Sequence, residues 1–323
     1  MKDTRIGCKK LSRDNRNDQL NNLSDVLILV EAAEDDWAYR EWIRNGIESR
    51  IIFKKQPKPI RAIRRFYIRS GLPFQNIWYS KEWKKSVKEA GLIILHINSL
   101  NMDMTAYINR LNPKARVIAW YWNSVSAHIR PTKLKGDCDI WSFDPENCKK
   151  YGMKFNHQYY FSSLADTSDK IMQDVYFCGS DSGRGKQITD IYDKLQKIGI
   201  TSRFQVVYPQ YGGLPKELIS PPVSYDVIRK NIAGTKAILE IVREGQSGAT
   251  VRTMEALFFR KKLITTNRSV VQEPFYDSRN IYLIKDGSLD GLKEFMMTDM
   301  KEFSQEYIDQ YDVIQWVNNF RDL

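Results

Sequence analysis

The stretch EGQSGATVRTMEALFFRKKLITTN, residues 244–267, joins a turn of Gly and small polar residues to an amphipathic helix and then to an apolar strand. It follows the apolar run AILEIV at 237–242, so a strand, a glycine-containing turn and a helix succeed one another. Such a helix start is where an α/β fold holds a phosphate, because its first backbone N–H groups have no partner within the helix. Arg252 and Glu255 lie one turn apart on this helix. The stretch therefore predicts a ligand that offers both phosphate and sugar hydroxyl groups.

Outside this stretch, apolar runs of strand length alternate with helical patterns along almost the whole chain. This alternation is typical of parallel sheets whose strands are joined by crossover helices. It predicts an α/β protein with two Rossmann-like domains facing a cleft. The strand-like runs are 26–31, 50–53, 77–79, 92–97, 116–122, 139–144 and 157–161 in the first half, and 174–179, 203–208, 237–242, 262–266 and 280–284 in the second.

The length of 323 residues also favours two domains over one. The small polar segment SSLADTSDK at 162–170 is the expected connection between them. The predicted organisation is a polar lead-in at 1–24, an N-terminal domain at 25–161, a linker at 162–173, a C-terminal domain at 174–300 and a C-terminal helix at 301–323.

Charge is distributed unevenly along the chain. The net charge is +11, and the stretch 50–81 holds nine Lys or Arg residues and no Asp or Glu. Such a concentration predicts an anionic partner, which is a lipid headgroup, a nucleic acid or a phosphorylated acceptor.

Other features argue against several classes of protein. No apolar run approaches the length of a transmembrane helix, and the polar N-terminus lacks the apolar core of a signal peptide. The cysteines have no paired spacing, which predicts free thiols in the cytosol, and the three histidines are scattered. Asp137-Cys138-Asp139 has the form of a metal-binding DxD motif but precedes an apolar strand. We therefore expect no bound metal and no cofactor.

A second glycine-containing turn, CGSDSGRGKQI at 178–188, also follows an apolar strand and opens a helix. Its small residues allow close backbone approach, and two basic side chains are placed to reach a diphosphate. It is neither a P-loop nor a dinucleotide fingerprint, so an ordinary helix start with solvated charges is the alternative. The candidates here are Gly179, Ser180, Arg184 and Lys186.

The remaining nucleotide-binding candidates lie around the opening stretch and on a short helix before it. Glu255 is expected to accept hydrogen bonds from ribose hydroxyls; the alternative is an ion pair with Arg252, Lys261 or Lys262 on a solvated face. Tyr225 begins its helix after Pro221 and Pro222, where it lies near a base or packs in the core. The other candidates are Gln246, Ser247, Gly248, Thr250 and Arg252.

These segments together resemble the C-terminal domain of bacterial GT-B glycosyltransferases that build capsule, exopolysaccharide and lipopolysaccharide. In that family this domain binds the nucleotide-sugar, and a glutamate in an E-A-L segment before a K-K-L turn holds the ribose; Glu255 matches it. The commoner pattern has a second Glu eight residues earlier, where this chain has Ser247. The resemblance implies an N-terminal acceptor domain, a terminal helix that packs back on that domain, and no need for a metal.

The first half supplies the expected acceptor side. Residues beyond the carboxyl ends of parallel strands are the candidates, because ligands of open sheets bind there. A base that deprotonates the acceptor is needed if the reaction inverts the anomeric carbon. Asp35 and Asp36 are the carboxylates placed for it, with capping of the next helix as the alternative. The acceptor-side candidates are Glu31, His96, Asn98 and Asn123.

The basic segment KKQPKPIRAIRRFYIRSGLPF at 54–74 has apolar residues at helical spacing among its cations. This pattern is typical of an interfacial helix on an anionic membrane, and a core helix with a solvated basic face is the alternative. The membrane-facing candidates are Lys58, Arg61, Arg64 and Arg65.

The sequence thus predicts a glycosyltransferase that moves a sugar from a nucleotide-sugar to a glycan or lipid-linked acceptor. We expect it to act in surface polysaccharide synthesis, in the cytoplasm, on the inner face of the cell membrane and without a nucleic-acid partner. The alternatives are a nucleotide-sugar epimerase of the same fold, and a non-enzymatic nucleic-acid-binding protein that uses the basic segment.

Overall fold

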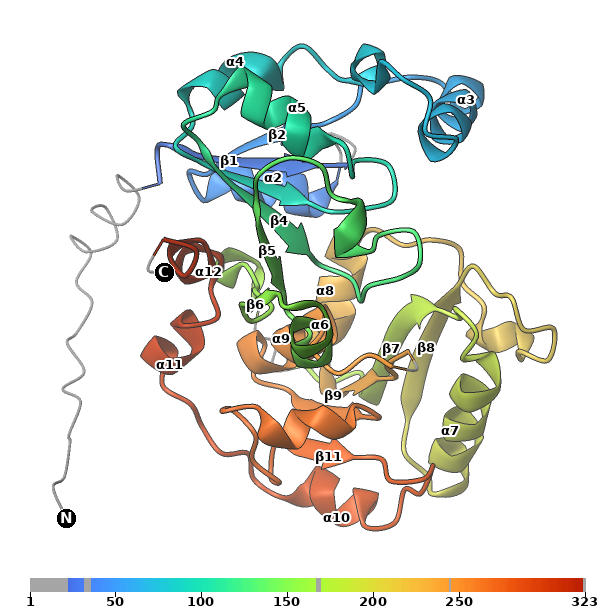
Figure 1. Ribbon diagram of the computed structural model, residues 1–323. Coiled ribbons are helices and arrows are strands. Elements are labelled where there is room, and N and C mark those ends of the chain that lie inside the picture. Colours follow the sequence, from blue (N-terminus) through green and yellow to red (C-terminus); the bar gives the residue numbers. More distant parts are fainter. Residues whose placement is uncertain (1–22, 32–35, 167–169, 244, 322–323) are drawn as a thin grey trace, which may run out of the picture. The chain divides into compact units, whose positions relative to one another are not determined.

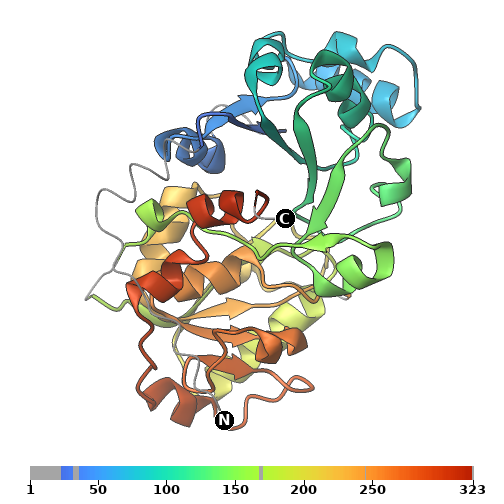
Figure 2. The ribbon, with the colours of Figure 1, turned by 60° about the vertical axis from the view of Figure 1, so that its left-hand side comes forward.

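The chain forms two compact units, divided between Trp141 and Ser142. The computed structural model describes residues 23–31, 36–166, 170–243 and 245–321. Each unit contains parallel strands with helices packed around them (Figures 1 and 2). The division lies upstream of the 162–173 segment, whose role as a linker stays a prediction.

The first sheet has the strand order β2-β1-β3-β4-β5-β6. Its central strands pair in parallel, with Leu27 opposite Ile93 and Leu95 opposite Ala119. All five residues of β1 are buried, as expected for a strand covered on both faces. The strands are β1 (Val26–Val30), β2 (Glu48–Ile51), β3 (Leu92–His96), β4 (Arg116–Tyr121), β5 (Asp139–Ser142) and β6 (Lys154–Phe155).

Short helices connect these strands. The α-helices of this unit are α2 (Trp37–Arg44), α3 (Lys58–Arg69), α4 (Trp83–Glu89) and α5 (Met104–Leu111), and the 3-10 helices are η1 (Gln75–Trp78) and η2 (Pro131–Lys133).

Two of the predicted strands are wrong. Residues 77–79 fall mostly in η1, because the Ile77 N–H donates to the Phe74 carbonyl and the Tyr79 N–H to the Asn76 carbonyl. Residues 157–161 join no sheet; Tyr160 instead exchanges backbone hydrogen bonds with the segment 311–313. Local backbone groups at 77–79, and the distant segment 311–313 at Tyr160, thus supply hydrogen bonds that a neighbouring strand would otherwise have made.

The second sheet has the order β11-β10-β9-β7-β8, and all its neighbours are parallel. Its strands are β7 (Gln173–Ser180), β8 (Ser202–Val207), β9 (Thr235–Glu240), β10 (Lys262–Thr265) and β11 (Ile281–Leu283). The helices of this unit are α6 (Pro145–Tyr151), α7 (Gly185–Lys197), α8 (Tyr225–Ala233), α9 (Val251–Phe258), α10 (Leu292–Met297), α11 (Gln305–Asp309) and α12 (Val313–Asn318), with 3-10 helices η3 (Ser162–Leu164), η4 (Lys216–Leu218) and η5 (Arg268–Gln272).

The core of the second unit forms where α7 covers the sheet. Ile188, Ile191 and Leu195 recur every three or four residues along α7 and are all buried. They belong to one cluster with Val175 and Phe204 of the strands. Burying each such side chain contributes about 1.5–3 kcal/mol, so this face fixes α7 on the sheet.

The last helices pack on the segment 156–162. Trp316 of α12 lies 4.4 Å, between ring centroids, from Tyr159, and the Asn156 side chain donates to the Trp316 carbonyl at 3.0 Å. The Ser162 N–H donates to the Asp312 carboxylate at 3.0 Å. These contacts lie within the second unit, and packing of the C-terminal helix on the first unit stays a prediction. Among the described residues no helix has the length and apolar character of a membrane span.

Replacing Ile188 with Ala tests the α7 core. Ile188 is fully buried, so Ile188→Ala should lower the free energy of unfolding by about 2–5 kcal/mol through lost burial and a new cavity. Val227→Ala, at a position that is 40% exposed on α8, is the control and should change it by less than about 0.5 kcal/mol. Urea denaturation followed by circular dichroism measures both, and equal losses would contradict this packing.

Candidate functional site

A groove lies at the carboxyl ends of β7, β9 and β10. The chain passes from β7 to β8 on one side of the sheet and then crosses to β9 on the other, so β7 and β9 flank a topological switch point. Open parallel sheets bind ligands at such points, because the loops after the two strands diverge. Three strand-end loops line this groove, which has a volume of about 1110 Å³.

The described groove lining is strongly basic. It contains four cationic side chains and one carboxylate, that of Asp190. A concave surface of this composition attracts anions. The cations are Arg184, Lys186, Arg243 and Arg268.

Arg184 ties together the loops on the two sides of the switch point. Its guanidinium donates to the carbonyls of Ser180 at 2.5 Å and Asp181 at 3.1 Å, and also to the Ile241 carbonyl beyond β9. Burial, with the nearby charge of Arg243, lowers the pKa of Arg184. The sequence assigned Arg184 to a diphosphate, whereas here its donors hold the groove walls.

Asp181, which the sequence analysis missed, organises the turn after β7. It is fully buried and accepts hydrogen bonds from the backbone N–H groups of Gln210 at 2.9 Å and Tyr211 at 2.6 Å. Burial acts to raise the pKa of Asp181, but these and further backbone donors lower it overall. Gly185 fits beside it because a β-carbon there would lie 2.3 Å from the Cβ of Tyr211. This packing, besides any ligand, accounts for the glycine at the start of α7.

The loop 245–250 is held from the side by Asp144. The Ser247 N–H and hydroxyl donate to the two carboxylate oxygens of Asp144 at 3.1 and 2.7 Å. A β-carbon on Gly248 would lie 2.4 Å from the Phe143 carbonyl, so only glycine allows this approach. Ser247 and Gly248, both predicted nucleotide contacts, therefore also position the loop.

Glu240, the last residue of β9, also holds this loop, through the hydroxyl of Thr250. Its carboxylate ends β9 at 2% exposure and accepts hydrogen bonds from the hydroxyls of Thr250 at 2.5 Å, Thr253 at 2.8 Å and Thr265 at 2.5 Å. Thr250 also caps α9, with Thr253 completing a capping box. The sequence signal for this network was a Glu inside the apolar run AILEIV, because a buried carboxylate needs hydrogen-bond donors.

Glu255 belongs to a separate buried network. It is fully buried, forms an ion pair with Arg252 and accepts a hydrogen bond from the Tyr225 hydroxyl at 2.8 Å. The Tyr225 hydroxyl in turn lies 2.6 Å from that of Tyr160. Burial raises the pKa of Glu255, while Arg252 and Tyr225 oppose the rise. The alternative of an Arg252 pair is thus observed, although Glu255 is buried and not on a solvated face.

The nucleotide-binding candidates accordingly fall into three groups. Arg184, Lys186 and Gln246 line the groove, and Gly179 and Ser180 lead into it at the end of β7. The second group, Ser247, Gly248 and Thr250, forms the loop that Asp144 and Glu240 hold. The third group consists of Tyr225, Arg252 and Glu255. Within the described ranges no three His, Cys, Asp or Glu side chains gather as a metal site.

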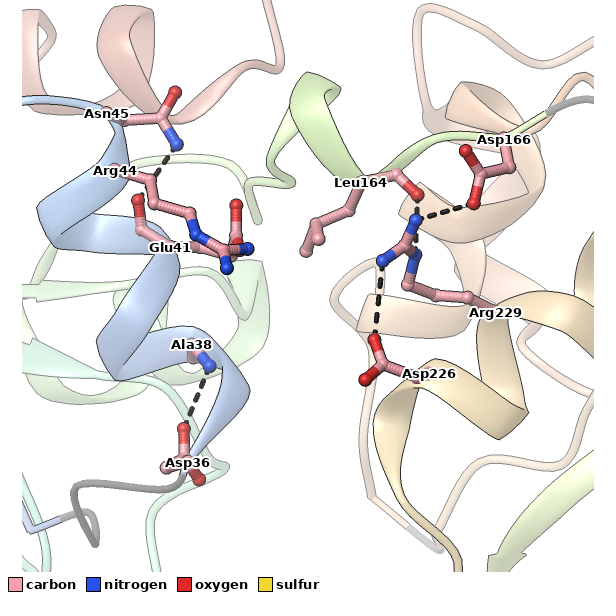
Figure 3. Close-up of polar contacts among 9 residues, drawn as sticks. All are labelled: Asp36, Ala38, Glu41, Arg44, Asn45, Leu164, Asp166, Asp226 and Arg229. Atoms are coloured by element: carbon pink, nitrogen blue, oxygen red, sulfur yellow. Dashed lines mark hydrogen bonds and ion pairs between the residues drawn. The ribbon is translucent and has the colours of Figure 1, made fainter.

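Asp36 caps the N-terminus of α2 in the first unit, and Figure 3 shows its carboxylate directed at the backbone of that helix. Its Oδ1 accepts hydrogen bonds from the N–H groups of Ala38 at 2.9 Å and Tyr39 at 3.3 Å, which is the capping alternative. Glu41 and Arg44 form an ion pair on the same helix. Asp35 lies outside the described residues. The catalytic role of both aspartates stays a prediction.

The acceptor-side candidates have defined surroundings within the first unit. Glu31 lies 3.4 Å from the Arg64 guanidinium; burial raises the pKa of Glu31, and Arg64 opposes the rise. Burial lowers the pKa of His96 to about 3, so its imidazole is neutral near pH 7. The Asn98 side chain accepts a hydrogen bond from the Leu100 N–H at 2.8 Å. Asn123 is exposed.

Arg229 fastens α8, the helix that carries Tyr225. Its guanidinium donates to the Leu164 carbonyl at 2.8 Å and to the Asp166 carboxylate at 2.5 Å, and it lies 3.4 Å from Asp226 (Figure 3). These contacts fix the start of α8 against the segment 164–166 and so help to place the Tyr225 hydroxyl.

The two-sheet α/β architecture is that of the GT-B glycosyltransferases, which confirms the predicted fold class. No protein-family model and no curated protein sequence matches the chain.

Three solved structures illustrate the likeness. HepE of Anabaena, in complex with UDP-glucose, has a TM-score of 0.57 and 11% identity, over 92% of this chain and 99% of HepE. AviGT4, a glycosyltransferase involved in avilamycin A biosynthesis, has a TM-score of 0.54 and 8% identity, over 92% and 96%. An α-glucosyltransferase in complex with UDP and a 13-mer DNA has a TM-score of 0.53 and 10% identity, over 92% and 94%. At these identities the likeness establishes the fold.

The carboxyl group of Glu273, just after η5, gives the second unit a pH dependence that can be measured. Burial and the nearby charge of Glu240 raise the pKa of Glu273 to about 7. In the unfolded chain the pKa is about 4.3, so the folded state holds the extra proton between these values and stability falls as pH rises through them. Glu273→Gln should therefore match the wild type in melting temperature below about pH 4 and exceed it increasingly toward about pH 8.

Thermal melts across this pH range provide the measurement. Glu306→Gln, at an exposed position on α11, is the matched control and should track the wild type throughout. A Glu273→Gln difference that is constant with pH would show that the carboxyl group does not titrate in this range.

Proposed function

We propose that this protein is a glycosyltransferase that takes a sugar from a nucleoside diphosphate sugar and passes it to an acceptor hydroxyl. The observation that carries the proposal is the basic groove at the β7/β9 switch point. Its described lining contains four cationic side chains and one carboxylate. The shared fold supports it, since two proteins solved in that fold, HepE and the α-glucosyltransferase, are in complex with UDP-glucose and with UDP.

The groove suits a diphosphate leaving group. In the transfer step, the bond between the anomeric carbon and the diphosphate oxygen breaks, and negative charge develops on the leaving diphosphate. Lys186 and Arg243 are exposed at the groove and place positive charge there. The N-terminus of α7 adds the positive end of a helix dipole. The side chain of its N-cap residue, Arg184, makes no capping hydrogen bond to the helix backbone.

The acceptor oxygen forms the new bond, and its proton passes to a base if the reaction inverts the anomeric carbon. Asp36 and Asp35 remain the proposed bases, and Glu31, His96, Asn98 and Asn123 the proposed acceptor-side residues. His96 enters this scheme as a neutral hydrogen-bonding group, because burial lowers its pKa to about 3. No metal is needed for this step, since side-chain cations and the helix dipole neutralise the diphosphate.

Glu255 enters the proposal through its neighbours. Its carboxylate is fully buried, whereas the Arg252 side chain keeps 25% exposure. We therefore propose that Glu255 positions the side chains of Arg252 and Tyr225. Glu255 can contact the ribose only if the nucleotide displaces one of these two partners. A buried charged hydrogen bond of this kind is worth about 1.5–3 kcal/mol, so an incoming hydroxyl must replace it.

The acceptor belongs to the proposal as well. We propose a glycan or lipid-linked acceptor in bacterial surface polysaccharide synthesis, on the inner face of the cell membrane. A thermal-shift panel of UDP-, GDP- and dTDP-sugars identifies the donor, because a ligand that binds only the folded state raises the melting temperature. Release of nucleoside diphosphate only when an acceptor glycan is present supports a transferase. Turnover without acceptor would indicate an epimerase, and stabilisation by oligonucleotides alone would indicate a nucleic-acid-binding protein.

Charge removal in the groove should weaken the diphosphate more than the nucleoside. Lys186→Ala or Arg243→Ala should lower UDP affinity about 10- to 100-fold by calorimetry, the effect of losing one charged hydrogen bond, and should leave uridine binding unchanged. Lys197→Ala, at the far end of α7, is the control. An equal loss for all three variants, or for UDP and uridine alike, would contradict a phosphate site in this groove.

A further inference from the structure

Helix α3 in the first unit presents three different faces. Figure 1 shows it at an outer edge of that unit. Arg64 and Ile68 form its buried face, at 4% and 7% exposure. Arg64 lies over the ring of Phe53, 4.1 Å from its centroid, and 3.4 Å from Glu31. The sequence placed Arg64 toward a membrane, but the structure turns this side chain inward because its helical position faces the body of the unit.

The two solvent faces of α3 differ in chemistry. Lys58, Arg61, Arg65 and Arg69 recur every three or four residues and are exposed, so they form a cationic face. Ile63 and Phe66 are also exposed, at 54% and 71%, and lie on the neighbouring face. Large apolar side chains in contact with water beside a row of cations indicate a surface with a partner.

The segment after α3 extends the apolar part of this surface. Leu72, Phe74 and Ile77 are 39%, 76% and 49% exposed. Phe74 has φ of 59°, a left-handed conformation that is costly for a bulky side chain. Such an outlier at an exposed aromatic residue points to a function, since burial in the core does not require it.

The surrounding contacts hold this segment in place. The Tyr67 hydroxyl of α3 donates to the Pro73 carbonyl at 2.5 Å, and the Lys54 ammonium donates to the Ile77 carbonyl at 2.6 Å. The Tyr67 and Trp78 rings also meet edge to face at 5.7 Å. The exposed side chains therefore sit on a fixed scaffold.

The charge and the apolar groups together select the partner. Residues 50–81 hold nine cations and no carboxylate, so the partner is anionic. A single-stranded nucleic acid offers bases to stack on Phe66 and Phe74, but it offers no apolar volume for the aliphatic Ile63, Leu72 and Ile77. A bilayer interface offers phosphate to the cationic face and acyl chains to both kinds of apolar side chain.

We propose that α3 and the segment 71–77 form a membrane-docking surface that binds anionic phospholipid, with Ile63, Phe66 and Phe74 entering the interface beside the cations. The binding stands apart from the enzymatic reaction, whereas its purpose, bringing the chain to a lipid-linked acceptor, rests on the proposed function. Binding through a few cations and a few apolar side chains is expected to be reversible and sensitive to salt.

Vesicle co-sedimentation of the full chain tests this surface. The wild type should bind vesicles of equimolar phosphatidylglycerol and phosphatidylcholine at low salt, and should bind pure phosphatidylcholine far more weakly. Arg61→Glu with Arg65→Glu should lower the partition coefficient at least about 100-fold, because each charge near the surface contributes about fivefold and the two reversals together change the charge by four. Lys85→Glu with Lys88→Glu, exposed on α4, makes the same charge change elsewhere in the unit and should reduce binding far less.

A second variant tests the apolar side chains of this surface, and its melting temperature shows whether the fold is intact. Phe66→Ala with Phe74→Ala should lower vesicle binding while the melting temperature and UDP affinity stay at wild-type values. Wild-type binding by this variant, no binding by the wild type at low salt, or equal losses in the α3 and α4 charge variants would each overturn the proposal. Capture of single-stranded oligonucleotide in place of vesicles, lost in the α3 variant, would also overturn it. Vesicle binding without UDP binding would retain this surface and remove the proposed function.

Discussion

The carboxylate of Glu240 is buried away from water and needs hydrogen-bond donors from the protein. The start of α9 and the course of the loop after β9 depend on that requirement. Glu240 ends β9 at 2% exposure, where an unpaired charge would be strongly destabilising. Three threonine hydroxyls meet it, from the cap of α9, its first turn and the end of β10. These bonds fix where α9 begins and therefore how the loop after β9 turns toward the groove.

The opposite wall of the groove is built by the same physical means. Asp181 gathers backbone N–H groups of the loop after β8, and Arg184 gathers carbonyls from the loops after β7 and β9. The charged side chains of Asp181 and Arg184 thus hydrogen-bond the backbone groups at the switch point, whereas two other cations, Lys186 and Arg243, remain exposed. A groove with fixed walls and exposed positive charge fits the diphosphate of the proposed function, because little reordering is needed when charge develops there.

The fold could be predicted from periodicity, whereas the roles of single residues could not. Alternation of apolar runs with helical patterns located the long strands. It failed at 77–79, where local 3-10 hydrogen bonds replace a strand, and at 157–161, where Tyr160 pairs with the distant segment 311–313. Strand-end reasoning found the groove loops. It did not find that Ser247 binds Asp144, 103 residues away, or that Arg184 donates to Ile241, because such pairs leave no mark in local spacing. The buried state of Arg64 was missed for the same reason, since its partners Phe53 and Glu31 lie on other elements.

A crystal structure of the protein soaked with UDP tests whether the groove at the β7/β9 switch point holds the nucleotide. The diphosphate should lie at the carboxyl ends of β7 and β9, near the N-terminus of α7, within hydrogen-bond distance of Lys186 or Arg243. A well-ordered nucleotide bound elsewhere, with this groove empty and its side chains unmoved, would show that the groove is not the nucleotide site.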